Sequence, residues 1–218
     1  MKRLVARRHA AGITALPPSV PGMRIGLFGG SFNPPHDGHR LVSREAMTRL
    51  GLDAVWWLVT PGNPLKSRSD LLPLTERVSL ARALVDHPRV HVTGFEAERG
   101  FRYTYDTLAF LKRALPGRHL VWIMGADSLA GFHRWERWEE IFRLLPIAVY
   151  ARPGSTRRAS FSRAAMRFAR YRLEESEAKT LATATPPRWV FLNGLMSSLS
   201  STAIRNGEAR RIADTKPD

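Results

Sequence analysis

Two histidines, His36 and His39, close a stretch rich in glycine and proline, GLFGGSFNPPHDGH, over residues 26–39. At the start of a helix, residues three apart share one helix face. Two imidazoles on one face can donate hydrogen bonds to a phosphate as negative charge develops on it. An isolated pair would more often be two surface histidines. The glycine-rich turn between a strand and a helix favours phosphate chemistry here.

The turn before the histidines differs from both common phosphate-binding signatures. It ends in Gly38-His39-Arg40 instead of the glycine, lysine and serine or threonine of a P-loop, and its glycines lack Rossmann spacing. Its position is nevertheless the same as that of both signatures, because it is a glycine-rich turn between a strand and a helix. Gly29 and Gly30 let the backbone approach a ligand closely, and the free amides of the helix start can hold phosphate.

A second phosphate-binding element is predicted near the end of the chain, in LSSTAIR at residues 199–205. Ser200, Ser201 and Thr202 can cap a short helix and leave its first amides free. Arg205 lies over the same helix end and can place two hydrogen bonds on a phosphate. Serine-rich caps are common, so this element indicates phosphate binding only in combination with the histidine turn.

Apolar runs and helical spacings alternate along the chain from Met23 onward. The predicted strands are residues 23–28, 54–60, 90–94, 119–125, 147–151 and 188–193. The predicted helices are residues 38–50, 75–87, 104–115 and 135–145. Strands separated by single helices form a parallel sheet with right-handed crossovers. The sequence therefore predicts a doubly wound α/β domain, in which ligands bind beyond the carboxyl ends of the strands.

The predicted nucleotide-binding domain spans residues 23–207, between an N-terminal extension and a polar tail at residues 208–218. Residues 1–22 are basic and acid-free, contain three prolines, and are expected to form a disordered extension. Their arginine-rich composition is also typical of a transit peptide. Residues 155–185 carry a cluster of arginines and fit either a basic amphipathic helix or a mobile insert.

Composition narrows the class of protein. The chain has 218 residues, a formal net charge of +15 and no cysteine, so disulfides and thiolate metal sites are excluded and a cytoplasmic protein is expected. No apolar stretch approaches the ~20 residues that span a bilayer, and we expect no membrane partner. The positive charge by itself suits nucleic acid, a membrane surface or a small polyanion, but the chain carries no RNA- or DNA-reading motif.

The motifs together resemble one enzyme family. GGSFNPPHDGH is similar to the (H/T)-x-G-H nucleotidyltransferase signature, and LSSTAIR to the I-S-S-T-x-I-R motif of that superfamily, with Leu199 in place of isoleucine. Four intervening segments resemble the bacterial nicotinate-nucleotide adenylyltransferases: TPGNPLK (60–66), RYTYDTL (102–108), MGADSLAGFHRWERWEEI (124–141) and ARPG (151–154). The resemblance covers residues 23–206, and the N-terminal extension has no counterpart in it.

The resemblance implies transfer of AMP from ATP to nicotinate mononucleotide, giving deamido-NAD and pyrophosphate, on a Rossmann-like fold. It implies Mg²⁺ as the companion of ATP, with His39 as the main α-phosphate contact and His36 beside it. The further residues that it implies for ATP and its phosphates are Gly29, Gly30, Ser31, Phe32, Lys66, Ser201, Thr202 and Arg205. Lys66 fits an ordinary exposed loop lysine equally well.

The resemblance also implies the remaining contacts of the two nucleotides. Gly125 and Asp127, at the end of a predicted strand, are implied to bind a ribose; a bare aspartate there is typical of a helix cap. Thr104, at a helix start, and Trp135 are implied to hold the nicotinate ring. Trp135 and Trp138 are expected on one helix face, with Trp138 packing inward.

Three alternatives stay open on sequence grounds. The acceptor could be nicotinamide mononucleotide or phosphopantetheine instead of nicotinate mononucleotide, because backbone amides can read the ring substituent. The basic charge leaves a nucleic-acid-binding module as a rival from another class. The oligomeric state, monomer or homo-oligomer, is not set by the sequence.

Overall fold

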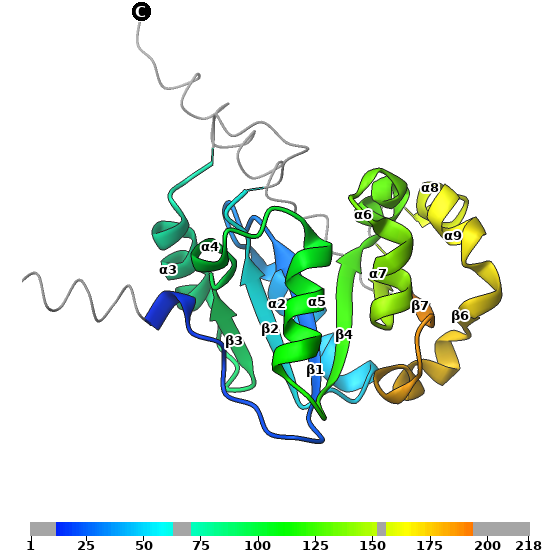
Figure 1. Ribbon diagram of the computed structural model, residues 1–218, viewed down its shortest axis with the longest axis horizontal. Helices are drawn as coiled ribbons and strands as arrows, with labels where there is room; N and C mark the ends of the chain where they lie inside the picture. Colours follow the sequence, from blue (N-terminus) through cyan, green and yellow to red (C-terminus); the bar gives the residue numbers. More distant parts are fainter. Residues whose placement is uncertain (1–11, 63–70, 152–155, 194–218) are drawn as a thin grey trace, which may run out of the picture.

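The computed structural model describes residues 12–62, 71–151 and 156–193 and contains, within them, one seven-stranded parallel sheet (Figure 1). Its strand order is β3-β2-β1-β4-β5-β7-β6. The strands are β1 (Arg24–Gly30), β2 (Ala54–Val59), β3 (Val90–Thr93), β4 (His119–Gly125), β5 (Ile147–Tyr150), β6 (Arg172–Leu173) and β7 (Trp189–Leu192). The doubly wound α/β prediction is confirmed, and β1 lies beside β4 where the order of the strands reverses.

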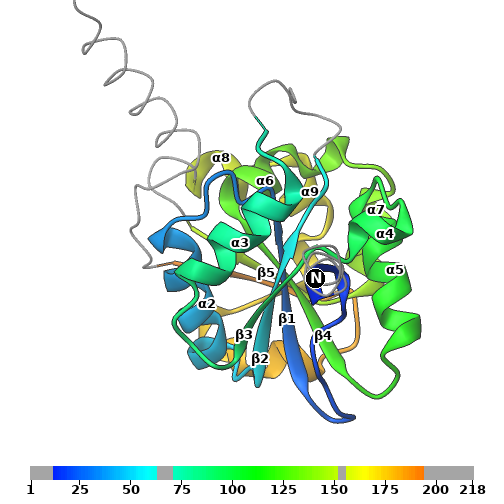
Figure 2. The ribbon, with the colours of Figure 1, turned by 90° about the vertical axis from the view of Figure 1, so that its left-hand side faces the viewer.

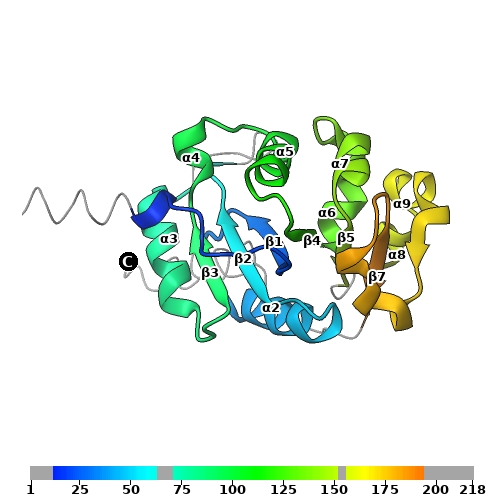
Figure 3. The same ribbon diagram turned by 60° about the horizontal axis from the view of Figure 1, so that its bottom comes forward.

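Helices cover both faces of the sheet. Figure 3 shows α4, α5 and α7 over one face and α2 and α3 over the other. The helices are α2 (Asp37–Arg49), α3 (Leu74–Leu84), α4 (Glu96–Arg99), α5 (Thr104–Ala114), α6 (Ala126–Gly131), α7 (Trp138–Leu144), α8 (Thr156–Ser160) and α9 (Arg163–Arg167). Short 3₁₀ helices are η1 (Phe132–Arg134), η2 (Ala169–Tyr171) and η3 (Glu175–Thr183).

The core has two halves because successive strand residues point to opposite faces of the sheet. Trp56 and Trp57 are neighbours on β2, and both are fully buried. Trp56 packs with Leu27 and Trp122 on one face, whereas Trp57 packs with Phe28 on the other. This burial on both faces explains why the strands appear in the sequence as continuous apolar runs.

Some elements differ from the sequence prediction. The helix expected at residues 135–145 begins only at Trp138, because Arg137 has a left-handed backbone (φ 55°) and Trp135 is extended. Trp135 and Trp138 therefore do not share a helix face. Trp138 does pack inward, with its ring edge-on to Phe168. The arginine-rich segment folds into α8, α9, η2, β6 and η3 instead of one amphipathic helix.

Residues 12–15 of the N-terminal extension lie on the domain beside β3 and α4, and residues 16–22 continue along it to the start of β1 (Figures 1 and 2). The carbonyl of Ile13 accepts a hydrogen bond from the Gly94 amide (2.8 Å), and the Thr93 hydroxyl donates to the carbonyl of Ala15 (2.9 Å). These bonds provide acceptors for the Gly94 amide and the Thr93 hydroxyl at the edge of the sheet. This part of the extension thus differs from the disordered segment expected from the sequence.

Arg77 on α3 joins the loops at the carboxyl ends of β1 and β2. Its side chain is 1% exposed, and Nη1 donates to the carbonyls of Ser31 (2.6 Å) and Thr60 (2.8 Å), while Nε donates to that of Leu72 (2.8 Å). Burial lowers the pKa of the Arg77 guanidinium, which stays protonated at neutral pH all the same. Within the described ranges no helix is long and apolar enough to be a candidate membrane span.

We predict that Arg77→Met lowers the free energy of unfolding by about 3 kcal/mol, because it leaves buried carbonyls at Ser31 and Thr60 without a donor. Urea unfolding followed by tryptophan fluorescence measures the change. Arg113→Met, on the exposed side of α5, is the matched control. An equal decrease in the free energy of unfolding in both variants would contradict the role given to Arg77.

We predict that a chain starting at Leu16 melts about 3–6 °C below the full chain, because it loses the bonds of Ile13 and Ala15 to the β3 edge. Differential scanning calorimetry measures the shift. A chain starting at Gly12 keeps these contacts and is the control. A melting temperature unchanged by the longer deletion would show that the contacts add nothing to stability.

Candidate active site

A cavity of about 360 Å³ opens at the carboxyl ends of the central strands. Its size lies within the ~300–1,000 Å³ typical of small-molecule sites. The loops after β1 and β2, the helices α4 and α6, the approach to α5 and the η1–α7 connection all contribute to its wall. The lining residues are Gly29, Gly30, Ser31, Thr60, Pro61, Gly62, Glu96, Phe101, Arg102, Tyr103, Thr104, Trp122, Ser128, Arg134, Trp135 and Glu136.

The structure brings together predicted residues from three distant parts of the sequence. Gly29, Gly30 and Ser31 come from the end of β1, Thr104 from the first position of α5, and Trp135 from the turn between η1 and α7. Trp135 is half-buried, and its ring packs against that of Phe132 at 5.0 Å between centroids. The cavity therefore joins a glycine turn, a helix start and an aromatic ring.

Gly29 is required by a close approach inside the protein. A Cβ at this position would lie 2.2 Å from Cη2 of Trp122 on β4. Trp122 is only 4% exposed, yet it also borders the cavity. Any larger residue at position 29 would therefore displace this indole or the β1 backbone at the border of the cavity.

The two histidines lie together at the start of α2. His36 is the N-cap residue and His39 follows three positions later, with 3.9 Å between the ring centroids. Nδ1 of His39 lies 3.1 Å from the amide nitrogen of His36 and 3.2 Å from the His36 carbonyl oxygen. In the tautomer whose Nδ1 accepts from that amide, Nε2 carries the proton and is the ring's donor. Both histidines are buried, and neither is among the described residues that line the 360 Å³ cavity.

Packing and hydrogen bonds fix the position of α2. The His39 ring lies 4.6 Å from Phe32, and Phe32 stacks on Trp57 at 5.0 Å. Nε1 of Trp57 donates to the Ser43 hydroxyl (2.7 Å), which donates to the carbonyl of His39 (2.8 Å). Phe32, predicted as an ATP contact, thus has a buried side chain that supports the histidine.

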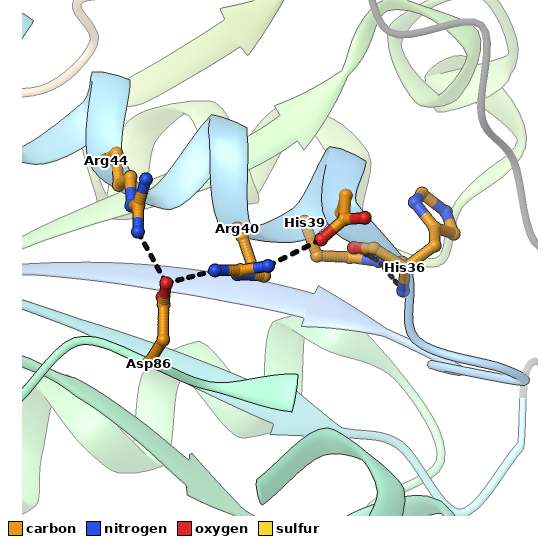
Figure 4. Close-up of polar contacts among 6 residues, drawn as sticks. His36, His39, Arg40, Arg44 and Asp86 are labelled. Carbon is orange, nitrogen blue, oxygen red and sulfur yellow. Dashed lines mark hydrogen bonds and ion pairs between the residues drawn. The ribbon is translucent and has the colours of Figure 1, made fainter. Parts of the chain in front are cut away.

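A charged cluster on the outer side of α2 ties the helix to the end of α3. Arg40 lies between Asp37 and Asp86, and Arg44 reaches the same Asp86 carboxylate (Figure 4). The hydrogen bond from Arg40 lowers the pKa of Asp86, so the carboxylate stays ionised at neutral pH. Partly exposed ion pairs of this kind contribute little individually, but two of them converge on the one carboxylate of Asp86.

The remaining predicted residues fall into two groups. Gly125 ends β4, and Asp127 is the second residue of α6, where it is exposed and outside the cavity lining. Lys66, Ser201, Thr202 and Arg205 lie outside the described residues. Their roles remain predictions from the sequence.

Sequence reasoning missed several residues of the cavity. Arg102 and Arg134 add two cations, while Glu96 is a buried carboxyl in the wall. The pattern FEAERGFR (95–102) gave no sign that Glu96 points inward, because α4 spans only one turn. Nothing in the sequence indicated that Arg77 is buried either, because α3 is an amphipathic helix that carries other charged residues as well.

Comparisons with known proteins agree with this arrangement. The cytidylyltransferase-like family model matches residues 27–207. A probable nicotinate-nucleotide adenylyltransferase of Methylorubrum extorquens is 61% identical over 183 residues, covering 84% of this chain and 99% of that protein. A Brucella abortus relative of the same name is 52% identical and covers 89% of this chain and 100% of that protein.

The fold itself matches a solved structure. Nicotinic acid mononucleotide adenylyltransferase of Plasmodium falciparum, complexed with NaAD, superposes with a TM-score of 0.63 at 18% identity. The match covers 84% of this chain and 82% of that one. With the family match over most of the chain and relatives above 50% identity, this chain belongs to the nicotinate-nucleotide adenylyltransferase family of cytidylyltransferase-like proteins.

Proposed function

We propose that this chain transfers AMP from ATP to nicotinate mononucleotide, forming deamido-NAD and pyrophosphate in NAD biosynthesis. One observation carries the proposal: a single cavity gathers the glycine turn, the start of α5 and Trp135 at the carboxyl edge of the sheet. The names of the relatives agree with it, as do Plasmodium falciparum structures complexed with NaAD and with APC. A cytoplasmic location, expected from the cysteine-free sequence, is part of the proposal.

The chemistry requires positioning and charge neutralisation. A phosphate oxygen of nicotinate mononucleotide attacks the α-phosphorus of ATP, and the bond to the β-phosphate oxygen breaks to release pyrophosphate. The attacking phosphate is already ionised at pH 7, so no protein nucleophile is required. Catalysis then comes from alignment of the two phosphates and from donors that meet the charge of the transition state.

The histidine turn supplies those donors. His39 donates from Nε2 to the α-phosphate, with His36 beside it and Ser31 at the cavity edge. Lys66, Ser201, Thr202 and Arg205 hold the β- and γ-phosphates in this proposal, on sequence grounds. Mg²⁺ enters with ATP, since phosphate oxygens are ligands that it prefers.

The pyridine nucleotide occupies the other part of the cavity. The pyridine ring stacks on Trp135, and its carboxylate meets Thr104 and the first amides of α5. Arg102 and Arg134 add positive charge to the same walls. Gly125 and Asp127, at the end of β4, take a ribose.

We predict pyrophosphate release from ATP and Mg²⁺ with nicotinate mononucleotide, and much slower release with nicotinamide mononucleotide or phosphopantetheine. His39→Ala should lower kcat about 100-fold or more, because a donor to the transition state is lost. A coupled pyrophosphate assay measures both. His119→Ala, at the opposite end of β4, is the matched control.

Each other outcome has a distinct meaning. Turnover with a different acceptor only would support the mechanism of AMP transfer and reject nicotinate mononucleotide as the acceptor. Full activity of His39→Ala would reject the role of the histidine turn. No turnover with any acceptor, together with oligonucleotide binding that weakens steeply with salt, would favour the nucleic-acid-binding alternative.

A further inference from the structure

Glu96 is a buried carboxyl in the wall of the cavity, and the proposed mechanism does not use it. It is the first residue of α4 and is 6% exposed. Its Oε1 accepts a hydrogen bond from the Thr107 hydroxyl on α5 (2.7 Å). A carboxyl that is removed from water and still borders a ligand cavity is costly to keep charged.

The hydrogen bond places Glu96 near the expected position of the pyridine substituent. Thr107 follows Thr104 by three residues on α5, so both lie on one face of the helix, one turn apart. Thr104 and Glu96 both border the cavity. A ring substituent held at the start of α5 therefore shares a partly dehydrated space with the Glu96 carboxyl.

The charged groups around Glu96 are few and mostly directed elsewhere. On its own helix, Glu98 accepts a hydrogen bond from Thr14 and Arg99 lies over the ring of Phe110 at 4.5 Å. On α5, Tyr105 lies under Arg137 at 3.6 Å, and Asp106 also interacts with that arginine. The titratable residues that line the cavity with Glu96 are Arg102, Tyr103, Arg134 and Glu136.

Burial decides the charge of this carboxyl. It raises the pKa of Glu96 to about 7, and the hydrogen bond from Thr107 offsets part of the rise because it favours the ionised form. Below this pH the carboxyl is protonated and can donate a hydrogen bond. Above it, an ionised Glu96 would face an anionic ligand in a region of low dielectric, where like charges repel strongly.

We propose that Glu96 is a specificity-determining residue: its protonated carboxyl admits an anionic substituent on the pyridine ring, and its ionised carboxylate repels one. The inference rests on the proposed function and deepens it. An uncharged amide substituent meets no such repulsion and can donate to the carboxylate. Discrimination between acid and amide substrates is therefore set by the charge of one buried residue as well as by the start of α5.

The sign of the pH dependence follows. Raising the pH through about 7 removes the proton from Glu96, so kcat/KM for nicotinate mononucleotide falls relative to kcat/KM for nicotinamide mononucleotide. Both acceptors carry the same phosphate, so their ratio cancels the titration of that group. For the full chain we expect this ratio to fall about tenfold or more between about pH 6 and about pH 8.5.

Two variants test the residue itself. Glu96→Gln keeps an oxygen for Thr107 and cannot ionise, so its ratio should be independent of pH. Thr107→Val removes the hydrogen bond that favours the ionised form of Glu96. The fall in the ratio of the two kcat/KM values should therefore occur at higher pH in this variant. Glu98→Gln makes the same chemical change two residues away, on an exposed side chain, and should follow the unsubstituted protein.

The outcomes separate this inference from the proposed function. Turnover of nicotinate mononucleotide at about pH 6 tests the function alone. If that turnover is present, a flat ratio in the unsubstituted chain, or an equal fall in Glu96→Gln, overturns the role of Glu96. If Glu96→Gln does not fold, Thr107→Val is the deciding variant. A fall in the kcat/KM ratio whose midpoint lies at higher pH supports the role of Glu96, and an unchanged midpoint overturns it.

Discussion

The buried guanidinium of Arg77 is the interaction on which the geometry of the site depends. It donates to the carbonyls of Ser31 and Thr60, which follow β1 and β2, and to Leu72 ahead of its own helix. Loops at the end of a parallel sheet have few backbone partners of their own. One side chain with a planar array of donors can hold several such carbonyls at once. The spacing between the loops that follow β1 and β2, which both border the cavity, is therefore set by this one side chain.

From that edge the site divides into two environments. On the α2 side, the histidines lie at a helix start supported by Phe32, Trp57 and Ser43, a setting for phosphate. On the α5 side, a helix start, Trp135 and Glu96 surround a cavity of about 360 Å³, a setting for a flat ring with a charged substituent. The residues that join the two are Gly29, Gly30 and Ser31. At Gly29 a side chain is excluded by Trp122.

Much of this framework could be predicted from the sequence because it rests on local signals. Continuous apolar runs marked the central strands, and the predicted strand at residues 119–125 coincides with β4. The predicted start of a helix at Thr104 is confirmed. What the sequence could not show depends on tertiary contacts. The left-handed backbone of Arg137 delays α7, and the inward direction of Arg77 and Glu96 follows only from what surrounds them. Ile13 and Ala15 bond to Gly94 and Thr93 at the end of β3, although the composition of residues 12–22 is that of a tail.

The most direct test of the account is a crystal structure of the full chain with deamido-NAD. The account predicts the pyridine ring against Trp135, its carboxylate at the start of α5 near Thr104 and Glu96, and the phosphates over Ser31 and the histidine turn. A product bound away from the cavity of Gly29, Thr104 and Trp135, or with its pyridine ring outside it, would contradict the central claim that this cavity is the nucleotide site.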